Sequence, residues 1–181
     1  MLYSDRKIIR LEAPFDQETL QTLRVGDEVL LTGEIFTARD QAHHRLNQLI
    51  QNGKKTPFDL KGQVIYYCGP TKTAPGKVIG SCGPTTSGRM DRHTALLLAK
   101  GLKGMIGKGR RSEDVRRLIK KHKAVYFLAT GGAGAFLSKR VVSAAPVYFK
   151  ELGPEAIYKL RVKDFPLIVG IDSRGSDIFQ K

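Results

Sequence analysis

Hydrophobic residues follow two patterns along this chain, namely short apolar runs and runs in which apolar positions recur every three or four residues. The short runs, bounded by Gly and Pro, predict strands over residues 7–12, 28–36, 64–67, 105–106, 124–129, 141–149, 156–162 and 166–171. Helical spacing predicts helices over residues 16–23, 37–51, about 85–99, 112–122 and about 130–140. Alternating strands and helices, followed by a run of strands, predict an α/β domain with a mixed sheet.

Single residues mark where several of these elements begin, bend or end. Thr37 is the predicted N-cap of the second helix, and Gly53 is its predicted stop. Ser112 is predicted to cap the helix over residues 112–122. Gly33 lies inside a predicted strand and indicates a bulge or a bend.

The stretch from Ser81 to Gly109 contains the candidate chemistry. Gly83-Pro84 ends any strand, and the hydroxyl residues 85–87 then precede the helix, with Arg89 in or near its first turn. The free N–H groups of a helix N-terminus suit an anion, and two hydroxyls with a guanidinium suit a carboxylate or a phosphate. An ordinary capped helix explains the same features equally well.

Length and composition indicate one domain over residues 1–181. Hydrophobic residues make up 41% of the chain and charged residues 27%, as in globular proteins. No apolar run approaches the roughly 18 residues of a membrane span, and no signal-peptide core opens the chain, so we expect a cytoplasmic protein without a membrane partner. Cys68 and Cys82 have no metal-ligand spacing; a disulfide between them is conceivable, but free thiols in a reducing compartment are favoured.

A formal net charge of +14 is the strongest compositional feature. Lys and Arg are dense over residues 100–123, where only Glu113 and Asp114 oppose them. This run is either a docking surface or a solvated face. A basic nucleic-acid-binding protein is an alternative of another class, but the basic segment offers no aromatic residue for stacking and no recognisable nucleic-acid motif.

Two glycine-rich segments are similar to nucleotide-binding loops without matching them. Gly107-Lys108 is followed by Gly109, where a P-loop has Ser or Thr. Residues 130–135 lack the third glycine of a dinucleotide loop. The first segment is therefore not a P-loop, and nucleotide binding by the second is a disfavoured alternative.

The motif Cys82-Gly-Pro-Thr-Thr-Ser-Gly-Arg-Met-Asp, followed by Ile-Gly-Lys-Gly at residues 106–109, resembles the signature of the class I (iron–sulfur) fumarases. Further segments extend the resemblance in order along nearly the whole chain, at residues 25–29, 33–43, 130–135 and 165–175. The match is to the C-terminal domain of the single-chain enzymes or the β subunit of the two-chain enzymes. The β subunit of L-tartrate dehydratase shares the fold and much of the motif.

The resemblance implies a swivelling β/β/α fold and a role as one part of a hydro-lyase. The implied reaction is the reversible hydration of fumarate to (S)-malate; the alternative in the same class is dehydration of tartrate to oxaloacetate. In the family, a [4Fe-4S] cluster carried by a partner α subunit acts on the hydroxyl group. This chain is therefore expected to bind no cluster or other metal, to join that iron–sulfur α subunit in an α2β2 assembly, and to be inactive alone.

Four site residues are carried over from the resemblance. Arg39, Arg89 and Lys108 would hold the two carboxylates of a small dicarboxylate substrate, because guanidinium groups can bind a carboxylate with two hydrogen bonds. Thr85 would be the base at the carbon centre, which requires a strongly cationic setting for so weak a base. His43 also lies in a matched segment, and its role is left open between the site and a structural hydrogen bond.

Overall fold

A computed structural model describes residues 8–180 of the 181-residue chain. Its strands are β1 (Ile9–Ala13), β2 (Glu28–Thr37), β3 (Val64–Tyr66), β4 (Gly104–Gly107), β5 (Val125–Leu128), β6 (Val141–Tyr148) and β7 (Ile157–Ile171). Its α-helices are α1 (Gln17–Thr22), α2 (Asp40–Gln51), α3 (Asp91–Ala99), α4 (Glu113–His122) and α5 (Gly134–Ser138). Two 3₁₀ segments, η1 (Ser87–Met90) and η2 (Lys150–Glu155), complete the fold.

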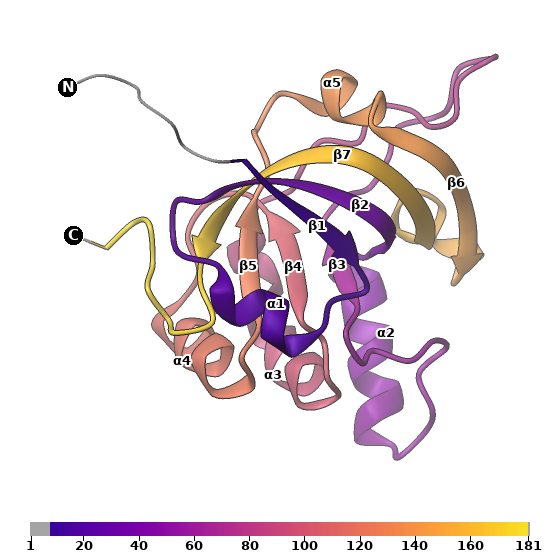
Figure 1. Cartoon of the computed structure of the whole chain (residues 1–181). Coiled ribbons are helices and arrows are strands. Elements are labelled where there is room, and N and C mark those ends of the chain that lie inside the picture. The colour runs from indigo at the N-terminus through magenta and orange to yellow at the C-terminus, as the bar shows by residue number, and fades with distance from the viewer. Residues whose placement is uncertain (1–7, 181) are drawn as a thin grey trace.

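The strands form one mixed sheet in the order β1-β2-β3-β4-β5-β7-β6, and β2 also pairs with β7. Strands β1 to β5 are mutually parallel, whereas β7 is antiparallel to β2, β5 and β6. The extra β2–β7 pairing closes the sheet on itself, and α2, α3 and α4 form a helical layer on one side of it (Figure 1). The α/β class with a mixed sheet and the β/β/α layering are therefore confirmed.

Closure of the sheet depends on a bend in β2 at Gly33. The register between β2 and β7 shifts between Leu31 and Gly33, as the predicted bulge requires. Gly33 has φ +119°, and a Cβ at this position would lie 2.3 Å from the carbonyl oxygen of Ala13. Only glycine satisfies both conditions, so this residue lets β2 turn from β1 towards β3.

Two hydrophobic cores lie on the two faces of the central strands. Inside the closed sheet, Tyr66, Ile106 and Phe127 are fully buried. Their neighbours Met105 and Tyr126 point the opposite way and pack against the helical layer. Alternate residues of β3, β4 and β5 thus enter different cores, which explains why these strands are apolar throughout.

The helices begin and end largely where their local signals place them. The Ser112 side chain accepts a hydrogen bond from the Val115 amide, which confirms it as the N-cap of α4. Val115 and Ile119 from α4 are buried. Among residues 8–180, no helix combines the length and apolar character that crossing a bilayer requires.

The predicted start of the second helix is wrong. Thr37 is the last residue of β2, Arg39 occupies the N-cap position, and α2 begins at Asp40. The Thr37 hydroxyl instead donates to the carbonyl oxygen of Ala156, between η2 and β7, and accepts from the amide of Tyr158 in β7. The predicted stop is confirmed, because Gly53 follows the C-cap residue with φ +65°.

The two strands predicted over residues 156–162 and 166–171 are one continuous strand, β7. Pro166 lies inside this strand, although proline has no N–H for the ladder. It is tolerated because β7 pairs with β6 only before residue 163 and with β5 only from Ile168, so Pro166 has a neighbour on one side alone. Asp164, with φ +48°, marks the local irregularity.

Candidate functional site

All four predicted site residues lie at one edge of the sheet, where the parallel strands end. Arg39 follows β2 and Lys108 follows β4, while the loop that contains Thr85 is joined to the residue after β3. The carboxyl ends of parallel strands meet at a common edge, and α/β domains place ligands there.

Arg39 is held at the N-terminus of α2 by two carboxylates. Its Nη2 lies 4.0 Å from Asp40 Oδ2 and 3.9 Å from Glu155 Oε1. Glu155 also accepts a hydrogen bond of 2.8 Å from the Gln41 amide, at the positive end of the helix dipole. The guanidinium packs closely on Gly69, where a Cβ would lie 2.8 Å from Nη1, so the loop after β3 fixes its position.

Thr85 and Arg89 are directly hydrogen-bonded to each other. The Thr85 amide donates to the Tyr67 carbonyl oxygen at 2.7 Å, which anchors the loop to the end of β3. Arg89 Nη2 donates to Thr85 Oγ1 at 2.5 Å and lies 3.4 Å from Asp40 Oδ2. Asp40 therefore connects both arginines, and the Thr85 oxygen faces a guanidinium.

Lys108 is attached to the same loop through its backbone. Its amide donates to the Thr85 carbonyl oxygen at 3.3 Å, and its carbonyl oxygen accepts from the Ser87 amide at 3.0 Å. The preceding residue must be Gly107, because a Cβ there would lie 2.0 Å from Ser87 Oγ. The Lys108 side chain is exposed and extends beside Gly131 in the loop after β5.

A buried arginine, Arg111, lies beneath the loop that contains Thr85 and is connected to it by a network of contacts. The Arg111 side chain is fully buried, and its Nε donates to Asp91 Oδ1 at 2.7 Å while its Nη2 donates to Thr94 Oγ1 at 2.8 Å. Its guanidinium carbon lies 5.4 Å from the ring centroid of Tyr67 and 5.1 Å from that of Tyr126. The Tyr126 hydroxyl donates to Ser87 Oγ, so the network reaches the loop that carries Thr85.

His43 is buried beneath the N-terminal turn of α2. Its Nδ1 lies 2.9 Å from the Arg39 carbonyl oxygen, and its ring stands edge-on to Tyr67. Burial lowers the pKa of His43 to about 4, with smaller lowering contributions from His93 and Arg111. The imidazole is therefore neutral at physiological pH, and as a donor to this carbonyl it holds the backbone of Arg39.

Residues 85–87 lie at the start of a helical segment, as predicted, but their side chains do not cap it. The turn after Thr86 is a 3₁₀ segment of four residues, and the Thr86 side chain makes no capping hydrogen bond. Thr86 is exposed, while Ser87 is buried and bonded to Tyr126. Cys68 lies just after β3, whereas Cys82 lies in the loop between β3 and η1.

Asp40 and Glu155 are parts of this arrangement that sequence reasoning missed. Asp40 lies beside Arg39 in the sequence, so its proximity was available as a signal. Glu155 reaches the site from η2, far along the chain, and no local pattern indicates this contact.

The cysteines and carboxylates of the described residues do not form a metal centre. Cys68 and Cys82 are both buried and not joined to each other. A hydrogen bond with Cys82 and burial raise the pKa of the Cys68 thiol. Over residues 8–180, no group of three or more His, Cys, Asp or Glu side chains is arranged to hold a metal ion.

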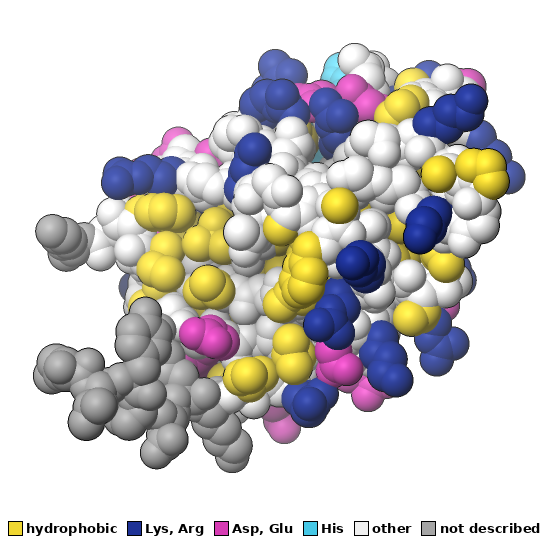
Figure 2. Space-filling view, turned by 90° about the horizontal axis from the view of Figure 1, so that it is seen from above, with side chains coloured by type: hydrophobic (Ala, Val, Ile, Leu, Met, Phe, Trp, Pro, Cys, Tyr) yellow, Lys and Arg dark blue, Asp and Glu magenta, His cyan; other side chains and the backbone are white. Residues whose placement is uncertain are grey.

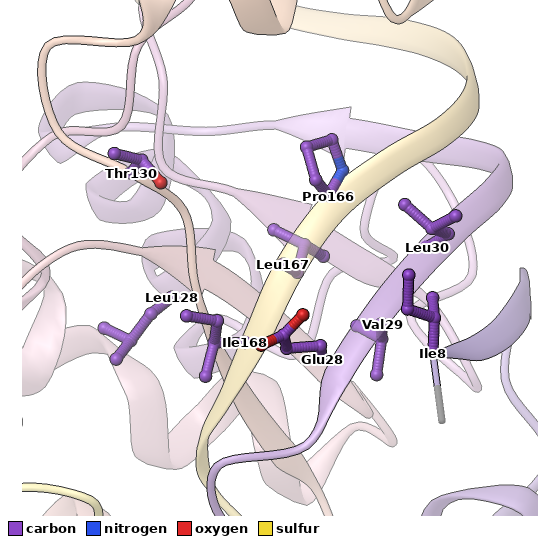
Figure 3. A pocket seen from close by; sticks show the side chains of 9 residues that line it. All are labelled: Ile8, Glu28, Val29, Leu30, Leu128, Thr130, Pro166, Leu167 and Ile168. Atoms are coloured by element: carbon purple, nitrogen blue, oxygen red, sulfur yellow. The ribbon is translucent and has the colours of Figure 1, made fainter. Parts of the chain in front are cut away.

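Two hollows differ in their suitability for an anion. One, of about 540 Å³, is lined by the two cations Arg89 and Arg92, by the carboxylates of Asp40 and Asp91, and by Ser112. Another, of about 270 Å³, lies over β2 and β7 and is mainly apolar, with the Glu28 carboxylate among its lining groups (Figure 3). None of the four predicted residues lines the apolar hollow, and its charge does not suit a dicarboxylate.

Fold and site together define an α/β domain that gathers three cations and a hydroxyl at the carboxyl edge of a closed mixed sheet. The chain belongs to the family described as Fumarase C-terminus, which it matches over residues 2–181.

Its relatives carry two kinds of name. It is 38% identical over 177 residues to fumarate hydratase 2 of Leishmania major, covering 96% of this chain and 31% of the relative. It is 42% identical over 159 residues to the anaerobic class I fumarate hydratase of Escherichia coli (strain K12), covering 87% of this chain and 29% of the relative. It is 38% identical over 171 residues to a putative L(+)-tartrate dehydratase subunit beta of Methanocaldococcus jannaschii, covering 91% of this chain and 88% of the relative. The chain thus spans about a third of these fumarate hydratases but most of the beta subunit.

Proposed function

We propose that this chain supplies one half of the active site of a class I fumarate hydratase, which interconverts fumarate and (S)-malate. The observation that carries the proposal is the hydrogen bond from Arg89 to Thr85 Oγ1, at an edge that also holds Arg39 and Lys108. A hydroxyl that accepts from a guanidinium is a suitable group to bear negative charge during proton transfer.

The cations would bind and orient the dicarboxylate. Arg39 and Arg89 are now neutralised in part by Asp40, at 4.0 and 3.4 Å, so a substrate carboxylate can replace this weak contact with a stronger one. Lys108, exposed on the neighbouring strand end, is free to reach the second carboxylate. Fixing both ends of the substrate would align one carbon with Thr85 Oγ1.

Thr85 would transfer the carbon-bound proton. In the dehydration direction its deprotonated oxygen takes a proton from the carbon next to a carboxylate. The electron pair left on that carbon forms the double bond as the C–O bond on the adjacent carbon breaks and the hydroxyl group leaves as hydroxide, which ends as water. The developing charge spreads into the carboxylate, where Arg and Lys side chains stabilise it. In the hydration direction the Thr85 hydroxyl returns the proton.

The hydroxyl group of the substrate must be handled elsewhere, since the described cysteines do not fit a cluster. Two buried thiols cannot supply the three or four ligands that a cubane needs. A [4Fe-4S] cluster on an α subunit would supply the Lewis acid for this group. The beta-subunit name of one relative supports such a partner, and we propose an α2β2 assembly.

Dehydration of tartrate to oxaloacetate is the second candidate. It is favoured by one observation, namely that the chain covers 88% of the relative named as a tartrate dehydratase beta subunit. Assay of the reconstituted pair with malate and with L-tartrate separates the two substrates.

A comparison of adjacent threonines tests the proposal. Thr85→Ala in the reconstituted enzyme is expected to lower kcat by about 10²–10⁴-fold with little change in KM or assembly. Thr86→Ala is the matched control, because that side chain is exposed and caps nothing. Arg89→Lys is expected to raise KM as well as lower kcat, because an ammonium group cannot form the paired contact. A normal kcat in Thr85→Ala would show that the base belongs to the partner.

A further inference from the structure

A groove beside the site has a composition that suits a polypeptide partner. It has a volume of about 630 Å³ and is lined by segments of residues 71–81 and 135–141. We name it the loop–α5 groove. The loop that forms one wall projects beside α5 and β6, away from the helical layer (Figure 1).

Large apolar side chains are exposed in and beside this groove. Val78, which lines it, is 50% exposed. Phe136 and Val142, which follow groove residues in the chain, are 50% and 49% exposed. Exposed apolar side chains gathered in one place are typical of a contact surface.

The charge of the groove has one sign. Lys72, Lys77 and Lys139 line it, and no carboxylate does. Its two walls come from stretches of sequence, residues 60–90 and 115–150, that contain no Asp or Glu. Seen from above, this side of the molecule shows Lys and Arg side chains between hydrophobic ones, with a smaller number of Asp and Glu side chains (Figure 2).

The three groove lysines differ from the arginines of α4 in having no neighbouring carboxylate among the described residues. On α4, Arg116 and Arg117 form ion pairs with Glu113 or Asp114 of the same helix, so the charge of these two arginines is neutralised in part within α4. None of the three groove lysines forms an ion pair with any residue between 8 and 180. Their charge is available to a partner.

The groove is continuous with the site through backbone contacts. The Thr71 amide donates to the Ser81 carbonyl oxygen at 3.0 Å, and the Cys82 amide donates to the Gly134 carbonyl oxygen at 3.3 Å. Thr85 is three residues further along the same loop. A polypeptide seated over Thr85 and Lys108 can therefore extend into the groove.

We infer that the loop–α5 groove binds an acidic, apolar-containing segment of the chain that completes the active site. The inference rests on the proposed function and names the surface by which the partner is held. Acidic side chains of the segment would pair with the three lysines, and its apolar side chains would cover Val78 and Phe136.

The test is the affinity of the full chain for the iron–sulfur chain of the proposed enzyme, measured by calorimetry. The variant Lys72→Glu/Lys77→Glu/Lys139→Glu is expected to raise Kd about tenfold or more at low salt, with a smaller difference from wild type in about 0.5 M salt. The control reverses Lys54, Lys55 and Lys121, which changes the net charge equally at the ends of α2 and α4 away from the site. Val78→Ser/Phe136→Ser is expected to weaken binding at both salt concentrations.

The possible outcomes distinguish failure of the groove assignment from failure of the proposed function. If wild type binds the iron–sulfur chain, and the groove variant and the control variant bind it with equal affinity, the assignment of the groove would be overturned while the proposed function would stand. Absence of any wild-type complex would overturn the proposed function, and the inference with it. Binding of a single-stranded RNA oligonucleotide that is lost only in the groove variant, with partner affinity unchanged, would reassign the groove to nucleic acid and also overturn the inference. Circular dichroism would establish that each variant is folded.

Discussion

His43 should make the stability of this protein depend on pH in a defined direction. Its ring is fully buried, and burial lowers its pKa from 6.5 to about 4. Below pH 6.5 the unfolded chain binds a proton at this residue, while the folded chain does not until the pH reaches about 4. The free energy of unfolding therefore falls as the pH decreases through this window, and the contribution of His43 does not change further below it.

The size of the effect follows from the pKa difference. Each pH unit within the window changes the free energy of unfolding by about 1.4 kcal/mol, so the whole window amounts to about 3 kcal/mol. This is a large part of the roughly 5–15 kcal/mol that stabilises a typical domain. His93 and Arg111 oppose protonation of the buried ring, whereas the Arg39 carbonyl and Asp40 favour it, and burial outweighs both.

Urea unfolding of wild type and His43→Asn between pH 4 and pH 8 measures this contribution. Asn can still donate a hydrogen bond to the Arg39 carbonyl but cannot titrate, so the variant should be less stable at pH 7 and less dependent on pH. Other titrating groups, including His93, remain in both proteins and cancel in the comparison. Parallel pH profiles for the two proteins would refute the assignment of a neutral buried imidazole.

Three further predictions concern packing, the buried cation and the cluster. Gly107→Ala should destabilise the fold by about 1–3 kcal/mol in urea unfolding, because its Cβ would lie 2.0 Å from Ser87 Oγ. Gly88→Ala is the control, because its Cβ would lie 3.8 Å from the Arg110 carbonyl oxygen, an ordinary contact. Equal losses of stability in the two variants would contradict this prediction. Arg111→Met should lower the free energy of unfolding by about 3–5 kcal/mol, because it removes the buried ion-pair partner of Asp91. A decrease of less than about 1 kcal/mol would show that this ion pair contributes little to stability. Anaerobic reconstitution of the isolated chain with iron and sulfide should give no cluster absorbance, and a stoichiometric cubane would contradict the proposed division of the site.

Local interactions made much of the fold predictable. The N-cap at Ser112 depends on a residue three positions away, so the sequence contains the whole signal. Thr37 has the same capping chemistry, but its hydroxyl is bound by residues 156 and 158, which local reasoning could not weigh. Pro166 has the properties of a strand breaker, and only the pairing of β7 with three neighbours explains why it does not act as one.

The candidate site was predictable through its motifs rather than through physical pattern. Arg39, Thr85, Arg89 and Lys108 were named from a resemblance, and the structure brings them to one sheet edge. Their roles in catalysis stay predictions. Contacts made across the fold, such as that of Glu155 with Arg39, could not be read from spacing, because the two residues belong to elements with no sequence relation.

The closing strand has a consequence for how the protein folds during synthesis. Glu28 pairs with Ile168 and Phe36 with Lys159, so β2 cannot complete its pairing until β7, which is synthesised much later, has left the ribosome. Non-local pairings of this kind slow folding and leave apolar strand faces exposed in the meantime. The four candidate site residues all precede β7. A nascent chain that has emerged only as far as η2 therefore contains every one of them, but its sheet still lacks the strand that closes it.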